Sequence, residues 1–206
     1  MNKGLLMKLI EKAENGATVY MSRYDAYLTD FEYMFGMRSY GFTGPAVSEA
    51  TLNLADGELK MPVNYFRTTD LQSIGAEVLG RDTEGRITFA CNKVGKGKFY
   101  YLAFPMEKRL GETPMVYCKE DAIPYWRVYR EMARDVIEAK PCITGNPMVA
   151  VTLHYENENS IIAVAVNYSN KEQNANLRIA DGWKCEYIYG SETIRTCDMA
   201  VIRLTK

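Results

Sequence analysis

The pattern of apolar and polar positions predicts a helix followed at once by a buried strand at the start of the chain. In residues 3–14 apolar side chains recur at helical spacing, and Asn15-Gly16 supplies a left-handed cap. The run 17–21 is short and β-prone, as buried strands are. A helix that leads directly into a buried strand is typical of a layered α/β structure. A second, short helix is predicted over 29–35, ended by Gly36.

The middle of the chain is predicted to hold strands and then one long helix. Glycines and prolines interrupt residues 38–75, which favours short strands or loops. Apolar runs at 76–79, 86–91 and 98–104 predict three strands, the last two joined by a tight hairpin at Gly95-Lys96-Gly97. Helical spacing over 121–138 then predicts a helix whose apolar face holds Trp126, Tyr129, Ala133, Val136 and Ile137.

The period of the pattern changes near residues 140–147, where two prolines and a glycine fall within eight residues. Beyond this point apolar residues alternate, and the pattern is purely β. We predict five strands, at 149–155, 162–168, 177–179, 183–189 and 200–204. The expected organisation is therefore an α/β domain over residues 1–140 and a small antiparallel β-sandwich over residues 141–206.

Composition narrows the function classes without naming one. The 206 residues are 47% hydrophobic and 25% charged, with a formal net charge of −1, so nothing draws the whole chain to nucleic acid or an anionic membrane. No apolar run is long enough to span a bilayer or to act as a signal peptide. Five widely spaced cysteines without a CxxC pair favour reduced thiols and a cytoplasmic location. With one histidine and no clustered cysteines, we expect neither a metal nor another cofactor.

Carboxylates follow two of the predicted strands. Asp25, Asp30 and Glu32 come after the strand 17–21, and Glu107 comes after the strand 98–104. If the two strands are parallel neighbours, their carboxyl ends share the sheet edge at which open α/β sheets bind ligands. Asp25 and Glu107 are then candidates for the paired carboxylates of a small glycosidase. The alternative, which we favour, is that these acids are solvated loop residues, with Asp30 and Glu32 stabilising a helix N-terminus.

Three further features carry a functional and a structural interpretation. Tyr100 and Tyr101 point to opposite faces of their strand, so one ring is a candidate for stacking on a sugar, as is Trp183; ordinary core packing is favoured. The glycine-lysine loop at 95–98 lacks the strand-to-helix context of a phosphate loop and is interpreted as a plain hairpin. His154 is predicted on the outer face of its strand, without a catalytic role.

Several segments together resemble one protein family. Residues 14–22, followed by Tyr24-Asp25-Ala26-Tyr27-Leu28 and Phe35-Gly36-Met37, resemble a stretch of class I glutamine-amidotransferase-like domains. These domains follow the catalytic barrel in microbial glycoside hydrolases, and the trimerisation domain of family 42 β-galactosidases is the nearest relative. The segment Gly95-Lys96-Gly97-Lys98-Phe99-Tyr100-Tyr101-Leu102, with Pro105-Met106-Glu107 after it, is similar to the closing strand of that domain. Residues 164–170, VAVNYSN, are similar to a strand of the C-terminal β-sandwich of the same enzymes.

The resemblance implies a partial flavodoxin-like domain, whose first strand and helix are expected to precede Met1, followed by the β-sandwich. In the family the catalytic carboxylates belong to a (β/α)₈ barrel, which needs about 200–250 residues by itself. No residue here inherits those roles, so the resemblance implies a non-catalytic accessory or oligomerisation region of a glycoside hydrolase. Its expected partners are a second copy of the chain, through an exposed edge strand, or a catalytic barrel. The alternatives are a carbohydrate-binding module that uses Tyr100, Tyr101 or Trp183, and a small glycosidase that uses Asp25 and Glu107.

Overall fold

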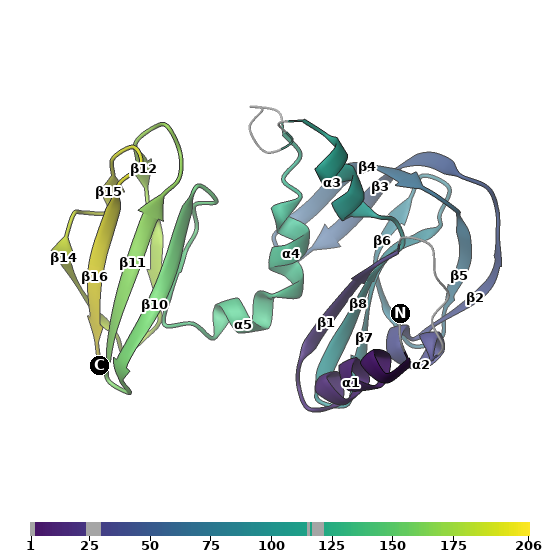
Figure 1. Ribbon diagram of the computed structural model, residues 1–206, viewed down its shortest axis with the longest axis horizontal. Helices are drawn as coiled ribbons and strands as arrows, with labels where there is room; N and C mark the ends of the chain where they lie inside the picture. The colour runs from purple at the N-terminus through teal and green to yellow at the C-terminus, as the bar shows by residue number, and fades with distance from the viewer. Residues whose placement is uncertain (1–2, 24–29, 115, 117–121) are drawn as a thin grey trace. The chain divides into compact units, whose positions relative to one another are not determined.

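The protein folds into two compact units, residues 1–133 and 134–206 (Figure 1). The computed structural model describes residues 3–23, 30–114, 116 and 122–206. The boundary predicted at residue 140 falls inside the second unit, just after the short helix α5 (Arg134–Glu138).

A six-stranded sheet with strand order β1-β8-β7-β6-β3-β4 forms the centre of the first unit. Its strands are β1 (Thr18–Ser22), β3 (Ala46–Leu54), β4 (Gly57–Tyr65), β6 (Glu77–Asp82), β7 (Ile87–Val94) and β8 (Gly97–Leu102). β1 and β8 are parallel, while the other neighbouring strands of this sheet are antiparallel. A separate antiparallel pair joins β2 (Met37–Phe42) and β5 (Thr69–Ser73). The unit is therefore β-rich, with a mixed sheet in which, among the described strands, only the pair β1 and β8 is parallel.

The helix α1 (Lys3–Glu14) confirms the first predicted helix and packs on the β7–β8 hairpin. It buries Leu6, Ile10 and Ala13, and Gly16 ends it with a φ of 110°. The backbone N–H of Lys96 donates to the carbonyl oxygen of Glu14 over 3.0 Å. A Cβ on Gly97 would lie 2.2 Å from the carbonyl oxygen of Ala17, closer than real Cβ atoms approach. The glycine-lysine loop is thus a hairpin, and its glycine allows the end of the helix to approach the backbone.

The prediction of short strands or loops over 38–75 is wrong for much of this segment, because β3 and β4 form a long hairpin. Each strand has nine residues, paired from Ala46↔Tyr65 to Leu54↔Gly57. Pro62 lies inside β4, opposite Glu49. A proline is tolerated there because β4 is the last strand of the sheet, so one of its edges needs no ladder hydrogen bonds.

Three shorter helices complete the first unit: α2 (Phe31–Phe35), α3 (Met106–Glu112) and α4 (Trp126–Met132). Gly36 ends α2 in the left-handed region, as predicted. The single helix predicted over 121–138 is wrong, because Ala133 leaves the helical conformation, with a ψ of 2°, between α4 and α5. The predicted apolar face is wrong as well. Val128 and Met132 are buried, whereas Val136 is 61% exposed.

Polar contacts turn α4 toward the β3–β4 hairpin. Arg127 donates to the carboxylate of Asp56 at 2.6 Å and to the carbonyl oxygens of the next two residues in the turn. The backbone N–H of Ala55 donates to Oε2 of Glu131, which is buried. Because these contacts come from two successive turns of α4, they fix which face of the helix meets the core.

The second unit is an antiparallel β structure. A four-stranded sheet has the order β10-β11-β16-β14, made from β10 (Val149–Asn157), β11 (Ser160–Asn167), β16 (Met199–Thr205) and β14 (Lys184–Tyr189). Two short pairs join β9 (Cys142–Thr144) to β13 (Leu177–Ile179) and β12 (Gln173–Asn174) to β15 (Thr193–Ile194). The core lies between these layers and is rich in small residues, including Ala163, Ala165, Ala175 and Ala200. Each of the five predicted strands is present.

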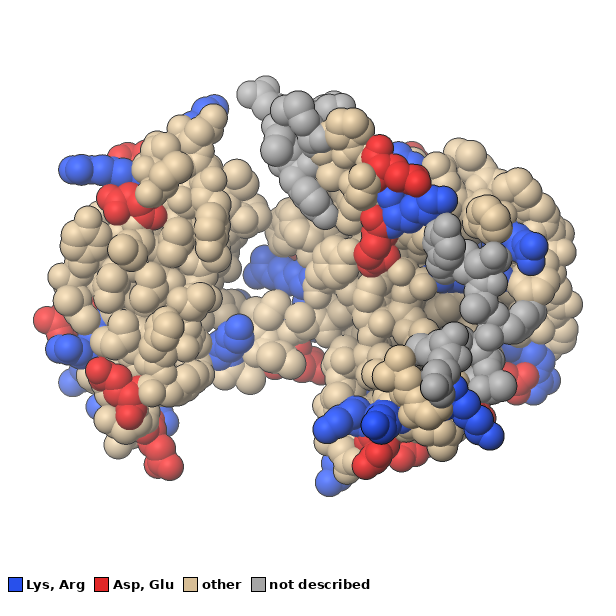
Figure 2. Space-filling view, in the orientation of Figure 1, with Lys and Arg blue, Asp and Glu red and all other residues tan. Residues whose placement is uncertain are grey.

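Charged side chains of both signs are interspersed over the face of the molecule drawn in Figure 2. Within the described residues, no group of three or more histidine, cysteine, aspartate or glutamate side chains is placed to hold a metal ion. No helix in the described part of the chain has the length and apolar character needed to cross a membrane.

Candidate functional site

The carboxyl ends of β1 and β8 share one edge of the sheet, because the two strands are parallel neighbours, which is the condition stated from the sequence. Their parallel register runs from Thr18↔Lys98 to Ser22↔Leu102, and the N–H of Arg23 extends it by donating to the carbonyl oxygen of Leu102. Beyond β8 the chain turns at Pro105 into α3, which places Glu107 in the first helical turn. Asp25, the other predicted carboxylate, lies outside the described residues. The structure therefore places one member of the predicted pair.

Hydroxyl groups from two elements hold the carboxylate of Glu107. The hydroxyls of Tyr20 on β1 and Tyr129 on α4 donate to its Oε1 over 2.7 Å and 3.0 Å, and Ser22 is a further hydrogen-bond partner. Burial acts to raise the pKa of Glu107, but the hydrogen bonds from Ser22 and Tyr20 outweigh it, so its pKa lies below the ordinary value. Burial, together with the hydrogen bond to Glu107, raises the pKa of Tyr20.

This arrangement suits a structural carboxylate better than a catalytic acid. A general acid must carry a proton near neutral pH, so its pKa has to be raised. The pKa of Glu107 moves in the opposite direction. Its partners come from β1 and α4, so the ionised side chain joins a strand and two helices at the sheet edge. Among the described residues, the hydrogen-bond partners of Glu107 are hydroxyl groups and not a second acid.

Two of the three aromatic candidates are buried, in line with the ordinary core packing that the sequence favoured over an accessible ring. Tyr100 is 3% exposed and stacks on Phe89, and Tyr101 is 5% exposed and packs edge-on against Phe31. The reason is the position of β8 inside the sheet, between β1 and β7, where every residue from Phe99 to Leu102 is buried and both faces of the strand are therefore covered. Neither ring is exposed for a sugar to stack on.

The remaining candidates lie in the second unit. Trp183 is half-buried against the core there, and the ammonium group of Lys206 lies 5.0 Å from its ring centroid. His154 is exposed on β10, as predicted, and its Nε2 lies 3.4 Å from the hydroxyl of Thr152. Neither residue lines the cleft described next.

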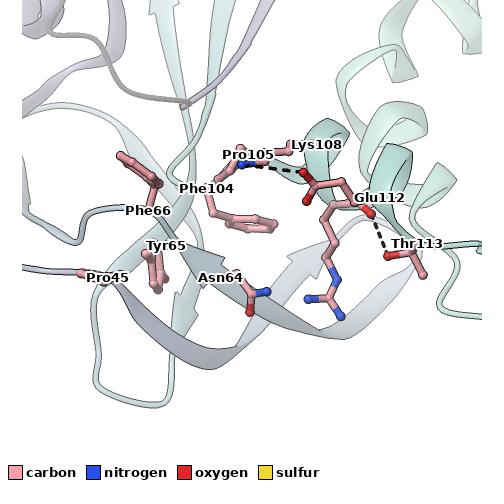
Figure 3. Close-up of a pocket in the computed structure, with 10 residues that line it drawn as sticks. Pro45, Asn64, Tyr65, Phe66, Phe104, Pro105, Lys108, Glu112 and Thr113 are labelled. Atoms are coloured by element: carbon pink, nitrogen blue, oxygen red, sulfur yellow. Dashed lines mark hydrogen bonds and ion pairs between the residues drawn. The ribbon is translucent and has the colours of Figure 1, made fainter.

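A cleft of about 360 Å³ lies between the end of β4 and the helix α3 in the first unit (Figure 3). One side is apolar, formed by Pro45, Tyr65, Phe66 and Phe104. The other side is polar, formed by Asn64, Lys108, Arg109, Glu112 and Thr113. We refer to this hollow as the α3 cleft.

Side chains of α3 and β4 meet across the polar side of the α3 cleft. With the amide oxygen of Asn64 turned toward α3, it accepts from Nη1 of Arg109 over 3.3 Å, and the amide nitrogen donates to the carbonyl of Val63. The ammonium of Lys108 lies 3.8 Å from the carboxylate of Glu112, one helical turn on. The hydroxyl of Thr113 donates to the carbonyl oxygen of Arg109, which closes the last turn of the helix.

Sequence reasoning missed the α3 cleft. The polar residues that come from α3 fall in a segment that was interpreted only through Glu107, and Asn64 and Phe66 fall in the segment expected to be irregular. The available signal was the sequence Lys108-Arg109 with Glu112 close behind, directly after a strongly apolar strand. That signal could not show that the end of β4 lies opposite, because β4 was not predicted.

Solved structures of larger enzymes contain the same fold. A β-galactosidase from Bacillus circulans sp. alkalophilus is similar to this chain, with a TM-score of 0.62 and 14% sequence identity. The match covers 98% of this chain and 31% of the β-galactosidase chain. A cold-adapted β-galactosidase from a Rahnella species matches 100% of this chain and 31% of its own, with a TM-score of 0.66 and 12% identity. A family 42 β-galactosidase from G. stearothermophilus, in a catalytic mutant form, is similar with a TM-score of 0.61 and 15% sequence identity. The match covers 100% of this chain and 30% of the enzyme's chain.

This chain has the fold of one region of family 42 β-galactosidases. The resemblance read from the sequence motifs is thereby confirmed at the level of the fold. The chain spans less than a third of the length of each of these enzymes. No protein-family model matches the sequence, and no curated protein matches it.

Proposed function

We propose that the chain is a non-catalytic accessory region of a β-galactosidase-like glycoside hydrolase, which associates with a catalytic barrel or with further copies of itself. The observation that carries the proposal is the coverage. The match takes in 98–100% of this chain but only 30–31% of the enzymes that share its fold. In this proposal α1, β1 and β8 correspond to part of an amidotransferase-like domain, and the second unit corresponds to the C-terminal β-sandwich.

The chemistry of the described residues supports a non-catalytic role. Hydrolysis of a glycoside needs a protonated acid and a second carboxylate roughly 5–10 Å away. Glu107 has a lowered pKa and is held by hydroxyl groups, so it does not meet the first condition. The candidate partner Asp25 lies outside the described residues. A small glycosidase built on Asp25 and Glu107 is therefore the less supported alternative.

An edge strand supports association with another chain. On the side away from β8, β1 pairs with no strand among the described residues. Such an edge presents unpaired N–H and C=O groups on which a further strand can add. Because Arg23 and Ala17 direct their backbone groups to β8, the alternating positions Thr18, Tyr20 and Ser22 direct theirs to the outer edge.

The test is to recover the tagged chain at its natural level from the cells that produce it and to assay the product with nitrophenyl β-galactoside. We expect stoichiometric recovery of a glycoside hydrolase barrel, with turnover by the assembly and none by the purified chain. Turnover by the purified chain that disappears in Glu107→Gln would show that the chain is itself the enzyme. Recovery of the chain with no glycosidase, in monomeric form, would also overturn the proposal.

A further inference from the structure

The α3 cleft has an apolar floor that is fixed in place before any ligand arrives. The hydroxyl of Tyr65 donates to Oδ2 of the buried Asp82, and the guanidinium of Arg86 binds the same carboxylate at 2.7 Å. The ring of Tyr65 meets the ring of Phe104 edge-on, with centroids 6.4 Å apart. Both rings are almost fully buried, at 5% and 1% exposure. Because these rings are already held in place, little side-chain conformational entropy is lost when a ligand packs on them.

An exposed aromatic ring stands beside this floor. Phe66 follows β4 directly and is 51% exposed, although large apolar side chains are usually covered. Figure 3 shows its ring on the same side of the cleft as Tyr65 and Pro45, across from the helix α3. The apolar side therefore offers a ligand an aromatic ring and a proline ring, with Phe104 beneath.

The polar side offers both donors and acceptors at short range. Arg109, Lys108 and the amide nitrogen of Asn64 donate, while the carboxylate of Glu112 and the amide oxygen of Asn64 accept. The carboxylate of Glu112 offsets one of the two positive charges of Lys108 and Arg109, and a small anion, which only accepts hydrogen bonds, would leave the acceptors of the cleft unused. A hydroxyl group donates and accepts at once, so a ligand that carries several hydroxyls can use both kinds of group.

We propose that the α3 cleft binds a neutral saccharide of one or two sugar units. A pyranose ring has an apolar C–H face and a rim of hydroxyls, which match the aromatic side and the polar side of the cleft. The volume of about 360 Å³ lies at the small end of the range for sites that bury one small molecule. The proposal concerns binding only and needs no barrel, so its test is independent of the test of the accessory role.

The experiment is saturation-transfer NMR on the full chain with the methyl glycosides of galactose, glucose, mannose and xylose, and with inorganic phosphate as an anionic probe. We expect weak binding of at least one glycoside, with transfer strongest to the ring C–H protons on one face. Phosphate should not compete. Phe66→Ala and Arg109→Ala should each weaken binding by roughly tenfold, as loss of an aromatic or arginine anchor does. Tyr168→Ala, which removes a ring that is 71% exposed in the second unit, is the matched control and should change nothing.

Four results would overturn the proposal. One is the absence of binding for every glycoside tested. Another is binding that survives intact in the Phe66→Ala, Arg109→Ala double variant while its thermal unfolding matches that of the wild type. The third is phosphate binding in the cleft with no saccharide binding, which would make the site an anion site. The fourth is loss of binding in the Tyr168→Ala control, which would place the site in the second unit.

Discussion

At the scale of single residues, two polar side chains account for sequence features that carried the resemblance to a known family. Glu107 follows the strand whose motif resembles a glycoside hydrolase region, and it joins β1, α3 and α4 through hydroxyl groups. Asn167 lies in the VAVNYSN segment and is 1% exposed. Its Nδ2 donates to the carbonyls of Lys171, Ile194 and Arg195, and its Oδ1 accepts from the N–H and hydroxyl of Ser169. The Asn-x-Ser pattern therefore builds a turn, not a ligand site.

Acid should weaken the first unit through Glu107. Because its pKa is lower in the folded protein, the ionised carboxylate stabilises the fold above the ordinary pKa of about 4.3. This contribution is lost as the pH falls through the lowered folded value. Because the side chain of Glu107 is partly exposed and its interactions are screened by solvent, Glu107→Gln should reduce the free energy of unfolding by only about 0.5 kcal/mol at pH 7 and leave it nearly unchanged at the acid end of the range. Urea unfolding across pH 3 to pH 7 measures this, with the exposed Glu49→Gln as control; an equal deficit at every pH would contradict it.

Removing the amide of Asn167 should unfold the second unit selectively. Asn167→Ala leaves buried carbonyl groups without a donor, and we expect a loss of about 3 kcal/mol of unfolding free energy. Asn167→Asp should be as harmful, because a carboxylate cannot donate to those carbonyls. In a Trp126→Phe background the remaining tryptophan, Trp183, reports on the second unit by fluorescence. The exposed Asn170→Ala is the control, and an Asn167→Ala protein as stable as this control would refute the prediction.

At the scale of elements, the packing of α1 on the β7–β8 hairpin explains why two distant sequence motifs occur together. The hairpin donates two backbone hydrogen bonds to the segment at the end of the helix. The N–H of Lys96 donates to the carbonyl oxygen of Glu14, and the N–H of Lys98 donates to that of Ala17. Gly95 has a φ of 59°, and a Cβ there would lie 2.5 Å from the Cα of Glu14. The two motifs are therefore the two sides of one contact, and this contact aligns β1 beside β8.

A methyl group at Gly97 should disrupt this contact. Gly97→Ala places a Cβ against the carbonyl oxygens of Ala17 and Ala13, at 2.2 Å and 2.4 Å. Neither oxygen belongs to a flexible side chain, so we expect the free energy of unfolding to fall by about 3 kcal/mol. Gly111→Ala is the matched control, because a Cβ there meets nothing within 4 Å and the residue lies in α3. Thermal unfolding should show this control equal to or slightly more stable than the wild type, and equal stability of the two variants would count against the contact.

At the scale of the whole molecule, the proposed association of the chain with further copies of itself can be tested at the outer edge of β1. Light scattering at micromolar concentration should give a mass above the 23.4 kDa of one chain. Thr18→Pro removes a backbone donor that faces away from β8, at the first residue of an edge strand where proline is tolerated. This variant should therefore shift the protein toward the monomer without unfolding it.

Thr18→Val keeps the backbone donor and should keep the mass of the wild type. A wild-type protein that is monomeric would remove the basis for self-association. An assembly that Thr18→Pro leaves unchanged would place the interface elsewhere on the molecule.

Local patterns in the sequence determined the helix α1, the β7–β8 hairpin and the strands of the second unit, whereas the parallel pairing of β1 with β8 was only a condition that the structure meets. Each of these elements depends on side-chain period or turn chemistry within a few residues, and such signals survive without tertiary context. The wrong predictions were those in which tertiary packing overrode a local pattern, as in the segments 38–75 and 121–138. Pro62 and Gly57 indicated breaks, but an edge strand and a turn accommodate them.

Tertiary structure alone decided the burial of Tyr100 and Tyr101, the break at Ala133 and the existence of the α3 cleft. Each of these features depends on which distant segment packs against a given residue. A single sequence does not show which distant segments are in contact. The α3 cleft requires the end of β4 and the helix α3, about forty positions apart in the sequence, to face each other. These two segments lie opposite each other because the strand order of the sheet places β4 at its edge. The strand order depends on many weak contacts, and no single motif encodes it.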